Sequence, residues 1–506
     1  MKPMSIKYTR FHLFTFFKHT FSRASVGKDL KRKIFRKNRL KLNMKANSIL
    51  AIVLVLVMLV SVFAWLSAGT GKPSEPDIVD PVSNDPTATA TLAPTNQSTA
   101  TPTLRPTTTP GWNPIQIIIP PEATRPPGIV ERAESTMWRS VANYAWNYFQ
   151  PGNGVDSNTG LPKASLGFPY FTDWDLGVYI QTVIDANKTG LIGYDGDWGS
   201  KARIEKVLAF LENRELNNAS YPFWFYQASN GKNFRGASDQ ATTIVDAVDT
   251  GRLFLALNNL KFFNGNLSTR IDNFVYNRVG NRSDYSVLIP GVKDESNTAI
   301  SIYSYYVTSG FACFWPNELL GATNKILNNI LAANYTTNGL FGVSLPKATI
   351  SCEPLLCSVF ELNNNPQLMN LTKQVYLAHE ARYNATGEYV AFSEGNTQTG
   401  FIYEWVVLPN GDTWKIMNAG ESTYSEMAPI IYTKVALGFL ALYNTTFTRS
   451  MNIFLEKAFQ DSSTGYYAGA NFKIDYDNVG LVLSVDSNTN GMIVSAARYA
   501  MQQKNP

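Results

Sequence analysis

The chain has 506 residues, of which 16% are charged and 44% hydrophobic, so its length allows one large domain or two to three ordinary ones. Its three histidines are His12, His19 and His379, which excludes any metal site with two imidazoles beyond residue 19. Three cysteines are too few for a disulfide scaffold, so apolar burial must hold the core.

The net charge of +5 is concentrated at the N-terminus. Residues 1–45 contain 14 of the 44 Lys and Arg residues but only one of the 39 acids, which leaves 30 bases against 38 acids in the rest of the chain. An acidic body argues against nucleic-acid binding, because that affinity comes mainly from phosphate neutralisation. We interpret residues 1–45 as a basic cytoplasmic segment that orients a membrane helix.

A hydrophobic run follows this basic segment. Residues 49–66 are interrupted only by Ser61, and as a helix they would span roughly 27 Å, close to the thickness of the hydrocarbon core. We predict a transmembrane helix or signal anchor at residues 46–69, which makes this a single-pass cell-membrane protein with an extracytoplasmic C-terminal domain. The alternative is a cleaved signal sequence that starts at Met44, in which case the protein is secreted.

The next segment has the composition of a linker. Gly71 to Pro127 contains 13 of the 26 prolines and many threonines. Such a segment cannot bury enough apolar surface to fold. We therefore predict a disordered linker at residues 70–127 and a folded domain at residues 128–506.

Twelve stretches of the folded domain have apolar residues at helical spacing. They cover residues 131–149, 173–186, 200–214, 240–258, 266–279, 296–314, 319–334, 353–363, 366–386, 424–443, 447–460 and 488–503. The connections after the odd-numbered stretches are long, and those after the even-numbered stretches are mostly short.

This alternation of loop lengths predicts the fold class. Short links make antiparallel neighbours, and a series of helical hairpins with all long loops on one side implies a closed ring. We therefore predict an all-α fold, an (α/α)6 toroid. The longest loop, residues 387–423, has the alternation of short strands, and we expect a small β-sheet insertion over the rim.

Acidic residues recur at the starts of the even-numbered helices, which we expect to line the ring. The candidate catalytic residues are Asp175, Asp249, Glu353 and Glu394. Asp175 and Glu353 have apolar neighbours that can raise a carboxyl pKa, and we expect them to form the reacting pair while Asp249 and Glu394 orient substrate hydroxyls. The structural alternative is that first-turn acids complement the helix dipole, and that Asp249 pairs with Arg252 on its own helix.

Aromatic residues are abundant in the same long loops. Flat apolar rings beside acids and amides suit sugar rings, whose C–H faces stack while their hydroxyls form hydrogen bonds. The candidate substrate-binding residues are Tyr170, Trp174, Trp224, Glu380, Tyr403, Glu404, Trp405, Asn488 and Asn490. The chain has neither a metal-ligand set nor a nucleotide-binding loop, so we expect no metal, cofactor or nucleotide.

Three further features have structural alternatives. Asp486 to Gly491 resembles the opening of an EF-hand calcium loop, but Ala497 stands at the twelfth position, which favours a helix cap. Cys352 and Cys357 either form a disulfide or are buried as thiols. His379 lies within a predicted helix, where a buried histidine with satisfied hydrogen bonds is expected.

Several motifs resemble one family of exported bacterial and archaeal proteins, domain of unknown function 3131. The motifs are Thr172-Asp-Trp-Asp-Leu-Gly, Asp249-Thr-Gly-Arg-Leu, Ser351-Cys-Glu-Pro, Glu380-Ala-Arg-Tyr-Asn-Ala-Thr-Gly, Phe392-Ser-Glu, Tyr403-Glu-Trp, Thr433-Lys-Val-Ala-Leu-Gly-Phe and Asn488-Thr-Asn. The resemblance implies an α/α toroid related to glucoamylase-like glycoside hydrolases and a link to cell-surface polysaccharide. It also favours Asp175, Asp249, Glu353, Glu380 and Glu394 as site residues.

These observations predict a membrane-tethered glycoside hydrolase that acts on a cell-envelope or environmental polysaccharide through two carboxyl groups. Analogy with related α/α barrels favours an inverting mechanism. The alternative function is a non-catalytic glycan-binding or scaffold protein of surface polysaccharide assembly. A polysaccharide lyase is a third possibility, but it needs a basic cluster, and the loops contain few bases.

Overall fold

The computed structural model describes residues 127–234, 246–278, 283–362, 365–397, 400–459, 463–473 and 480–502. The predicted cytoplasmic segment, membrane helix and linker therefore lie outside the described residues, apart from Pro127. Within the described part of the chain, no helix is both long enough and apolar enough to cross a membrane.

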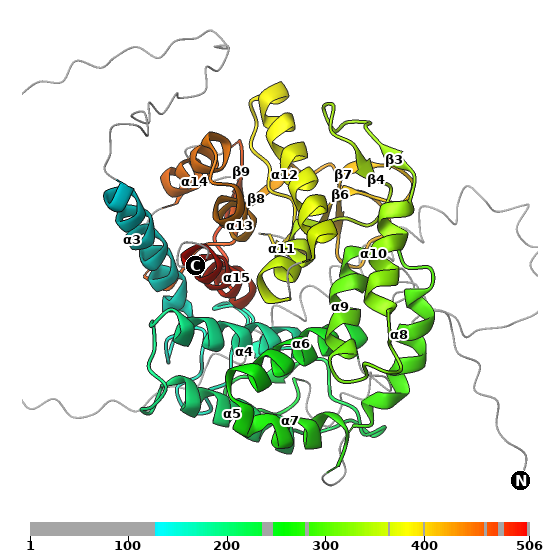
Figure 1. Cartoon of the computed structure of the whole chain (residues 1–506). Coiled ribbons are helices and arrows are strands. Elements are labelled where there is room, and N and C mark those ends of the chain that lie inside the picture. Colours follow the sequence, from blue (N-terminus) through cyan, green and yellow to red (C-terminus); the bar gives the residue numbers. More distant parts are fainter. Residues whose placement is uncertain are drawn as a thin grey trace, which may run out of the picture. The chain divides into compact units, whose positions relative to one another are not determined.

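Six helices of the described residues surround the centre of the domain (Figure 1). Each packs against the next in chain order, and the last packs against the first, so the ring is closed. These inner helices are α4 (Asp173–Lys188), α6 (Ala247–Phe263), α9 (Ile302–Ala312), α11 (Cys352–Glu361), α13 (Thr433–Tyr443) and α15 (Ser487–Gln502). Nearly all residues of α9 and α11 are buried, as expected for helices covered on every side.

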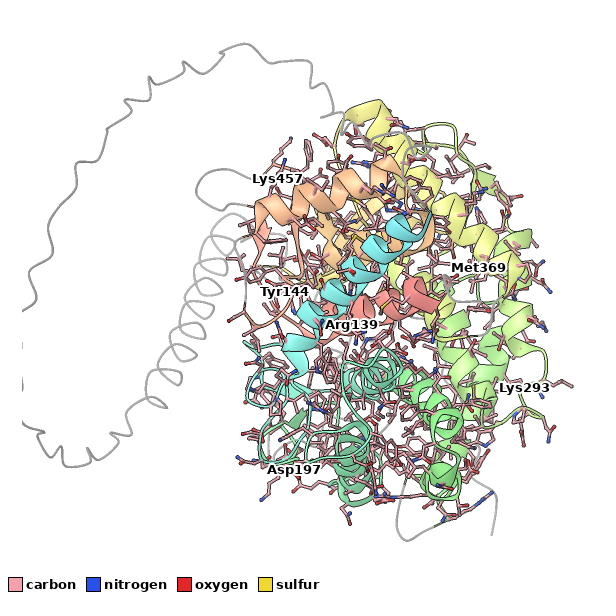
Figure 2. The ribbon with its side chains drawn as sticks, turned by 60° about the vertical axis from the view of Figure 1, so that its left-hand side comes forward. Arg139, Tyr144, Asp197, Lys293, Met369 and Lys457 are labelled. Atoms are coloured by element: carbon pink, nitrogen blue, oxygen red, sulfur yellow. The ribbon has the colours of Figure 1, made fainter. Side chains whose placement is uncertain are left out.

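A second layer of helices packs outside this ring. Its members are α3 (Pro127–Trp146), α5 (Ser200–Asn213), α7 (Ser268–Val275), α10 (Ala322–Ala332), α12 (Pro366–Thr386) and α14 (Thr446–Ala458). Each outer helix contacts an inner one; α3, for example, packs on α15. Tyr144 of α3 (labelled in Figure 2) also meets Tyr466, in the loop before β9, at 4.6 Å between ring centroids. The predicted alternation of outer and inner helices is therefore confirmed, and the domain is a helix-rich α/α toroid.

Short antiparallel sheets accompany the helices. Three strands, β5 (Glu394–Asn396), β6 (Phe401–Val407) and β7 (Thr413–Asn418), form a sheet within the loop where the sequence predicts one. The other sheets are β1 (Tyr170–Phe171) with β2 (Tyr226–Gln227), β3 (Tyr335–Thr336) with β4 (Leu345–Pro346), and β8 (Ile430–Tyr432) with β9 (Gly469–Asn471) and β10 (Leu481–Val482). β1 leads directly into α4 and β8 into α13, so these strands lie where inner helices begin.

Three local predictions are wrong. The predicted helix over residues 424–443 begins only at Thr433, because residues 430–432 form β8 and pair with β9. Helix α8 (Ile289–Ser296) lies in a segment predicted as a loop. Residues 389–392 do not form the first strand of the insertion, which begins at Glu394.

Glycines allow two inner helices to approach closely. A Cβ atom on Gly310 of α9 would lie 1.9 Å from the carbonyl oxygen of Gly251 in α6, a distance that no side chain tolerates. The two glycines therefore set the distance between these helices.

A buried polar network fills the ring between the inner helices. Arg252 of α6 forms an ion pair with Glu361 at the end of α11, and Arg498 of α15 forms one with Asp185 of α4 at 2.8 Å. Tyr306 donates a hydrogen bond of 2.7 Å to Glu361. Arg252 is thus occupied by another helix, and the structural alternative in which Asp249 pairs with Arg252 is not observed.

Candidate functional site

The first turn of α4 holds Asp175 in a hydrogen-bonded frame. Thr172 caps this helix, and its backbone N–H donates to Asp175 Oδ2 at 3.0 Å, which completes a capping box. The hydroxyl of Ser487, at the start of α15, donates to Asp175 Oδ1 at 2.7 Å. Burial raises the pKa of Asp175 to about 6, and the hydrogen bonds from Ser487 and Thr172 oppose that rise. Both carboxyl oxygens of this buried side chain therefore have protein donors.

Glu353 is held even more completely. Its side chain is 0% exposed and forms an ion pair with Lys434 of α13, which is also buried. The Ser393 hydroxyl donates to Glu353 Oε2 at 3.2 Å, and the Asn488 side chain donates to Glu353 Oε1 at 2.5 Å. Consecutive residues of α15, Ser487 and Asn488, thus connect Asp175 on one side with Glu353 on the other.

Glu394 begins strand β5 and is only half-buried. Burial and the neighbouring Glu353 carboxylate raise the pKa of Glu394 to about 8, whereas Lys434 and the Tyr303 hydroxyl beside it lower it. Glu394 therefore carries a proton at neutral pH. Among the described residues it forms no ion pair.

Asp249 and Asp246 stand together at the start of α6. Asp246 caps the helix and accepts backbone hydrogen bonds from Val248 at 2.8 Å and Asp249 at 3.4 Å. Burial and the Asp246 carboxylate raise the pKa of Asp249 well above its ordinary value, and the Thr172 hydroxyl opposes the rise. Both acids are half-buried. Two neighbouring carboxyls of this kind titrate as a pair, so they tend to share one proton.

The phenol of Tyr403 interacts electrostatically with both half-buried acid groups, Glu394 and the Asp246–Asp249 pair. Burial, Glu394, Asp249 and Asp246 all raise the pKa of Tyr403 well above its ordinary value, in that order of effect. The carboxyls of α6 and β5 therefore act on the same hydroxyl, although about 145 residues separate them in the chain. Tyr403 is half-buried and stacks on Trp405 at 5.7 Å.

The acids described above form the acidic cluster: Asp175, Asp246, Asp249, Glu353 and Glu394. Trp174 and Asn488 lie beside this cluster. The indole of Trp174 donates to the Asn488 side-chain oxygen at 3.4 Å and packs against Tyr306 at 6.0 Å. Both Trp174 and Asn488 are half-buried. Tyr170 and Trp224 lie further along the loops that carry β1 and β2; Trp224 is 51% exposed, and Tyr170 packs on Phe234 at 4.4 Å.

Four predicted substrate-binding residues have contacts that suit a structural role. Glu404 is buried and accepts hydrogen bonds from the backbone N–H groups of Ile430 at 2.8 Å and Ser393 at 3.3 Å. Asn490 is buried and clamps the backbone of Tyr466. Trp405 is almost fully buried. Glu380 lies on outer helix α12, where Tyr376 donates to it at 2.7 Å, so it is not brought to the cluster.

Sequence reasoning missed several residues of the cluster. These residues are neutral or basic, and each lies close to one of the acids. They are Lys434, Ser393, Ser487 and Tyr303. Lys434 stands in an otherwise apolar helix start, Thr433-Lys-Val-Ala-Leu, and that isolated charge was the available signal.

The remaining sequence alternatives are resolved in favour of structural roles. Asp486 accepts from the backbone N–H of Thr489 at 2.6 Å, as a residue that caps α15 does. Cys352 and Cys357 are free, buried thiols. His379 is buried with both ring nitrogens in contact with protein groups. No group of residues suited to a metal ion occurs within the described ranges.

The fold and this cluster define the chain as an α/α-toroid protein with a carboxyl-rich centre where the inner helices begin. It belongs to the family described as protein of unknown function DUF3131, whose model matches residues 140–503. No curated protein sequence matches the chain significantly.

Solved structures with a similar fold come from several organisms. They include a glucoamylase-like protein from Bacteroides caccae, with a TM-score of 0.48, 14% identity and coverage of 73% of this chain and 95% of that one. An endo-β-1,2-glucanase from Chitinophaga pinensis has a TM-score of 0.47, 12% identity and coverage of 73% and 94%. A cellobiose 2-epimerase from Bacillus thermoamylovorans has a TM-score of 0.42, 9% identity and coverage of 72% and 100%. These proteins are described with different activities, so the similarity concerns architecture alone.

Proposed function

We propose that this protein is a glycoside hydrolase that cleaves an oligosaccharide or polysaccharide by carboxyl acid–base catalysis, with Glu394 and Asp249 as the reacting groups. The observation that carries the proposal is the presence of two half-buried acid groups that form no ion pair within the described residues and that both raise the pKa of Tyr403, beside fully satisfied Asp175 and Glu353. Glycosidic cleavage needs one carboxyl that is protonated at working pH and one that is ionised.

In this mechanism Glu394 is the general acid. Its pKa of about 8 keeps it protonated at neutral pH, and its partial exposure lets it reach a glycosidic oxygen. The Asp246–Asp249 pair shares a proton and therefore keeps one negative charge, which can activate a water molecule. We propose an inverting mechanism, in which the ionised member of the Asp246–Asp249 pair activates a water molecule on the face of the sugar opposite Glu394.

This assignment reverses the roles expected from sequence. Asp175 and Glu353 were expected to react, but each has a protein donor on both carboxyl oxygens and little or no exposed surface. A reacting carboxyl must approach the substrate or a water molecule. We therefore propose that Asp175 and Glu353 hold the cluster in place, and that Trp174, Tyr403 and Asn488 contact the sugar.

We also propose that the hydrolase is tethered to the cell membrane by the hydrophobic run at residues 49–66, with the toroid outside the cytoplasm. The supporting observation is the 18-residue apolar run with a basic flank on its N-terminal side alone. Protease protection of the toroid in spheroplasts, as opposed to its digestion, would contradict this orientation.

The activity test uses the full chain with α- and β-glucans, mannans and arabinans, and measures reducing ends. Glu394→Gln and Asp249→Asn should each lower turnover at least 100-fold. The matched controls are Glu318→Gln and Asp197→Asn, which change exposed acids away from the cluster (Figure 2 labels Asp197) and should retain activity.

The same experiment separates hydrolysis from the alternative, a non-catalytic glycan-binding protein. Glycan binding by the wild type without any release of reducing ends would favour the binder. Full activity in both Glu394→Gln and Asp249→Asn would refute the acid–base assignment. Nuclear magnetic resonance of the first-formed product anomer tests inversion.

A further inference from the structure

The imidazole of His379 lies between the two segments that carry Glu353 and Glu394. It belongs to outer helix α12 and is 0% exposed. Its Nδ1 is 2.8 Å from the carbonyl oxygen of Val375, one turn earlier, so Nδ1 carries the proton. Nε2 is therefore the unprotonated nitrogen, and it can only accept hydrogen bonds.

Two donors point at this Nε2. The backbone N–H of Phe392 lies at 3.3 Å, and the Cys352 Sγ lies at 3.7 Å. Burial, assisted by Glu404, raises the pKa of the Cys352 thiol well above its ordinary value, so this group keeps its proton and can donate. Phe392 precedes Glu394 by two residues, and Cys352 directly precedes Glu353.

The residue between Phe392 and Glu394 is fixed from the other side. The backbone N–H of Ser393 donates to Glu404 Oε2 at 3.3 Å, and the Ser393 hydroxyl donates to Glu353 Oε2 at 3.2 Å. The two residues before Glu394, Phe392 and Ser393, are thus connected to α12, β6 and α11.

We propose that His379 is a positioning residue, which as a neutral imidazole fixes Phe392 and Cys352 and thereby sets the placement of Glu394 relative to Glu353. The effect on catalysis rests on the proposed function. The contacts that His379 makes with Phe392 and Cys352, named the His379 contacts below, do not depend on any activity. Protonation of Nε2 turns the acceptor into a donor, which faces the backbone N–H of Phe392 and breaks that hydrogen bond.

The surroundings of the ring keep it neutral. Burial lowers the pKa of His379 to about 4, the Val375 carbonyl opposes this effect, and Arg382 on the same helix adds to it. The titratable or charged groups that the structure places against the ring are Cys352 of α11 and Arg382 of α12. Strand β7 and helix α13 contribute the rings of Trp414 and Phe439, each 5.1 Å from the imidazole.

Two substitutions of His379 distinguish the effect of its hydrogen bonds from the effect of its packing. His379→Leu fills a similar space but removes the acceptor, whereas His379→Gln keeps an acceptor oxygen and cannot be protonated in this range. The matched control is Phe439→Leu, which loosens packing against the same imidazole and leaves the Phe392 hydrogen bond in place.

Amide hydrogen exchange of the full chain at pH 7 is the first measurement, and it needs no substrate. His379→Leu should speed exchange in peptides that cover residues 391–394 about 10-fold, with little change in α14, and His379→Gln should stay close to the wild type. Unchanged exchange at residues 391–394 in His379→Leu, or an equal increase throughout the domain, would overturn the proposal.

Kinetics and histidine resonances complete the test. On a glycan that the wild type cleaves, His379→Leu should lose about 10- to 100-fold in kcat with KM nearly unchanged, because the carboxyls shift while the sugar contacts remain. The chain has only three histidines, so the resonance that disappears in His379→Gln can be followed in the wild type and should not titrate above about pH 5. Titration of this resonance near pH 6.5 would contradict the His379 contacts. Faster exchange at residues 391–394 in His379→Leu, in a protein that cleaves no glycan, would support the His379 contacts and refute only the proposed hydrolase.

Discussion

Replacing Lys434 by methionine should destabilise the toroid more than any loss of a surface charge. The side chains of Lys434 and Glu353 are 2% and 0% exposed, so water cannot reach the carboxylate that the substitution leaves behind. Two neutral donors, Ser393 and Asn488, still face Glu353. Removing one partner of such a buried pair costs about 3–5 kcal/mol of unfolding free energy, and the remaining donors place the expected loss near 3 kcal/mol.

The assay is urea unfolding of the full chain followed by tryptophan fluorescence. The matched control is Arg449→Met, since Arg449 forms an ion pair with Glu134 at 3.6 Å in which the side chains are 36% and 25% exposed. That change should cost less than about 1 kcal/mol. The double variant Lys434→Met with Glu353→Gln should recover most of the loss, because no charge is then buried, the amide oxygen can accept from Asn488, and the amide nitrogen can donate to the Ser393 hydroxyl oxygen. Equal losses in Lys434→Met and Arg449→Met would refute the reasoning.

Three other outcomes follow from single features of the structure. Burial raises the pKa of Glu404 from 4.5 to about 8, so the folded state takes up this proton first, and the unfolding free energy should rise as pH falls from 8 towards 5; a Glu404→Gln variant should lack that part of the rise in pH-dependent urea unfolding. Gly310→Ala should cost about 1–3 kcal/mol or more, because its Cβ meets the α6 backbone at 1.9 Å, whereas Gly265→Ala, with open space around it, should change thermal unfolding little. Thr172→Ala and Thr445→Ala each remove a capping-box residue and should cost about 1 kcal/mol, but only Thr172→Ala should also lower the rate of glycan cleavage; equal activities in the two would contradict the site.

The helical layers could be predicted from sequence because they depend on local periodicity. The stretches at 173–186 and 366–386 match α4 and α12 to within two residues, since each begins with a capping residue and continues an apolar face. The start of α13 could not be found in this way. Met427, Ile430 and Ile431 also fit a helical spacing, and only pairing with β9, about 40 residues later, makes residues 430–432 a strand.

The candidate site was predictable in its residue types but not in its roles. Most of these acids stand at the starts of inner helices, which is visible in the sequence. The structure links Asp249 with Asp175 and Glu394 with Glu353, and Tyr403 interacts with both Asp249 and Glu394. Exposure and hydrogen-bond partners depend on distant residues. Lys434 lies 81 residues from its partner Glu353, and no local pattern predicts that contact.

The distribution of hydrogen-bond donors explains how the acids at the centre of the ring divide into two sets, one with a structural role and one proposed to react. A carboxylate that receives two or more protein donors is stabilised in its charged form and needs no water, so it can be buried. Asp175 has its donors from Ser487 of α15 and the Thr172 backbone, and Glu353 has its donors from Lys434 of α13, Asn488 of α15 and Ser393. Glu394 and Asp249 each lie beside another acid and form no ion pair within the described chain, so their charged forms are disfavoured and protons remain close to the centre of the ring. Burial has the largest effect on both pKa values, and a neighbouring acid adds to it: Glu353 for Glu394, and Asp246 for Asp249. Neutralising Glu353 should therefore lower the pKa of Glu394 as well as remove hydrogen bonds that hold the structural acids.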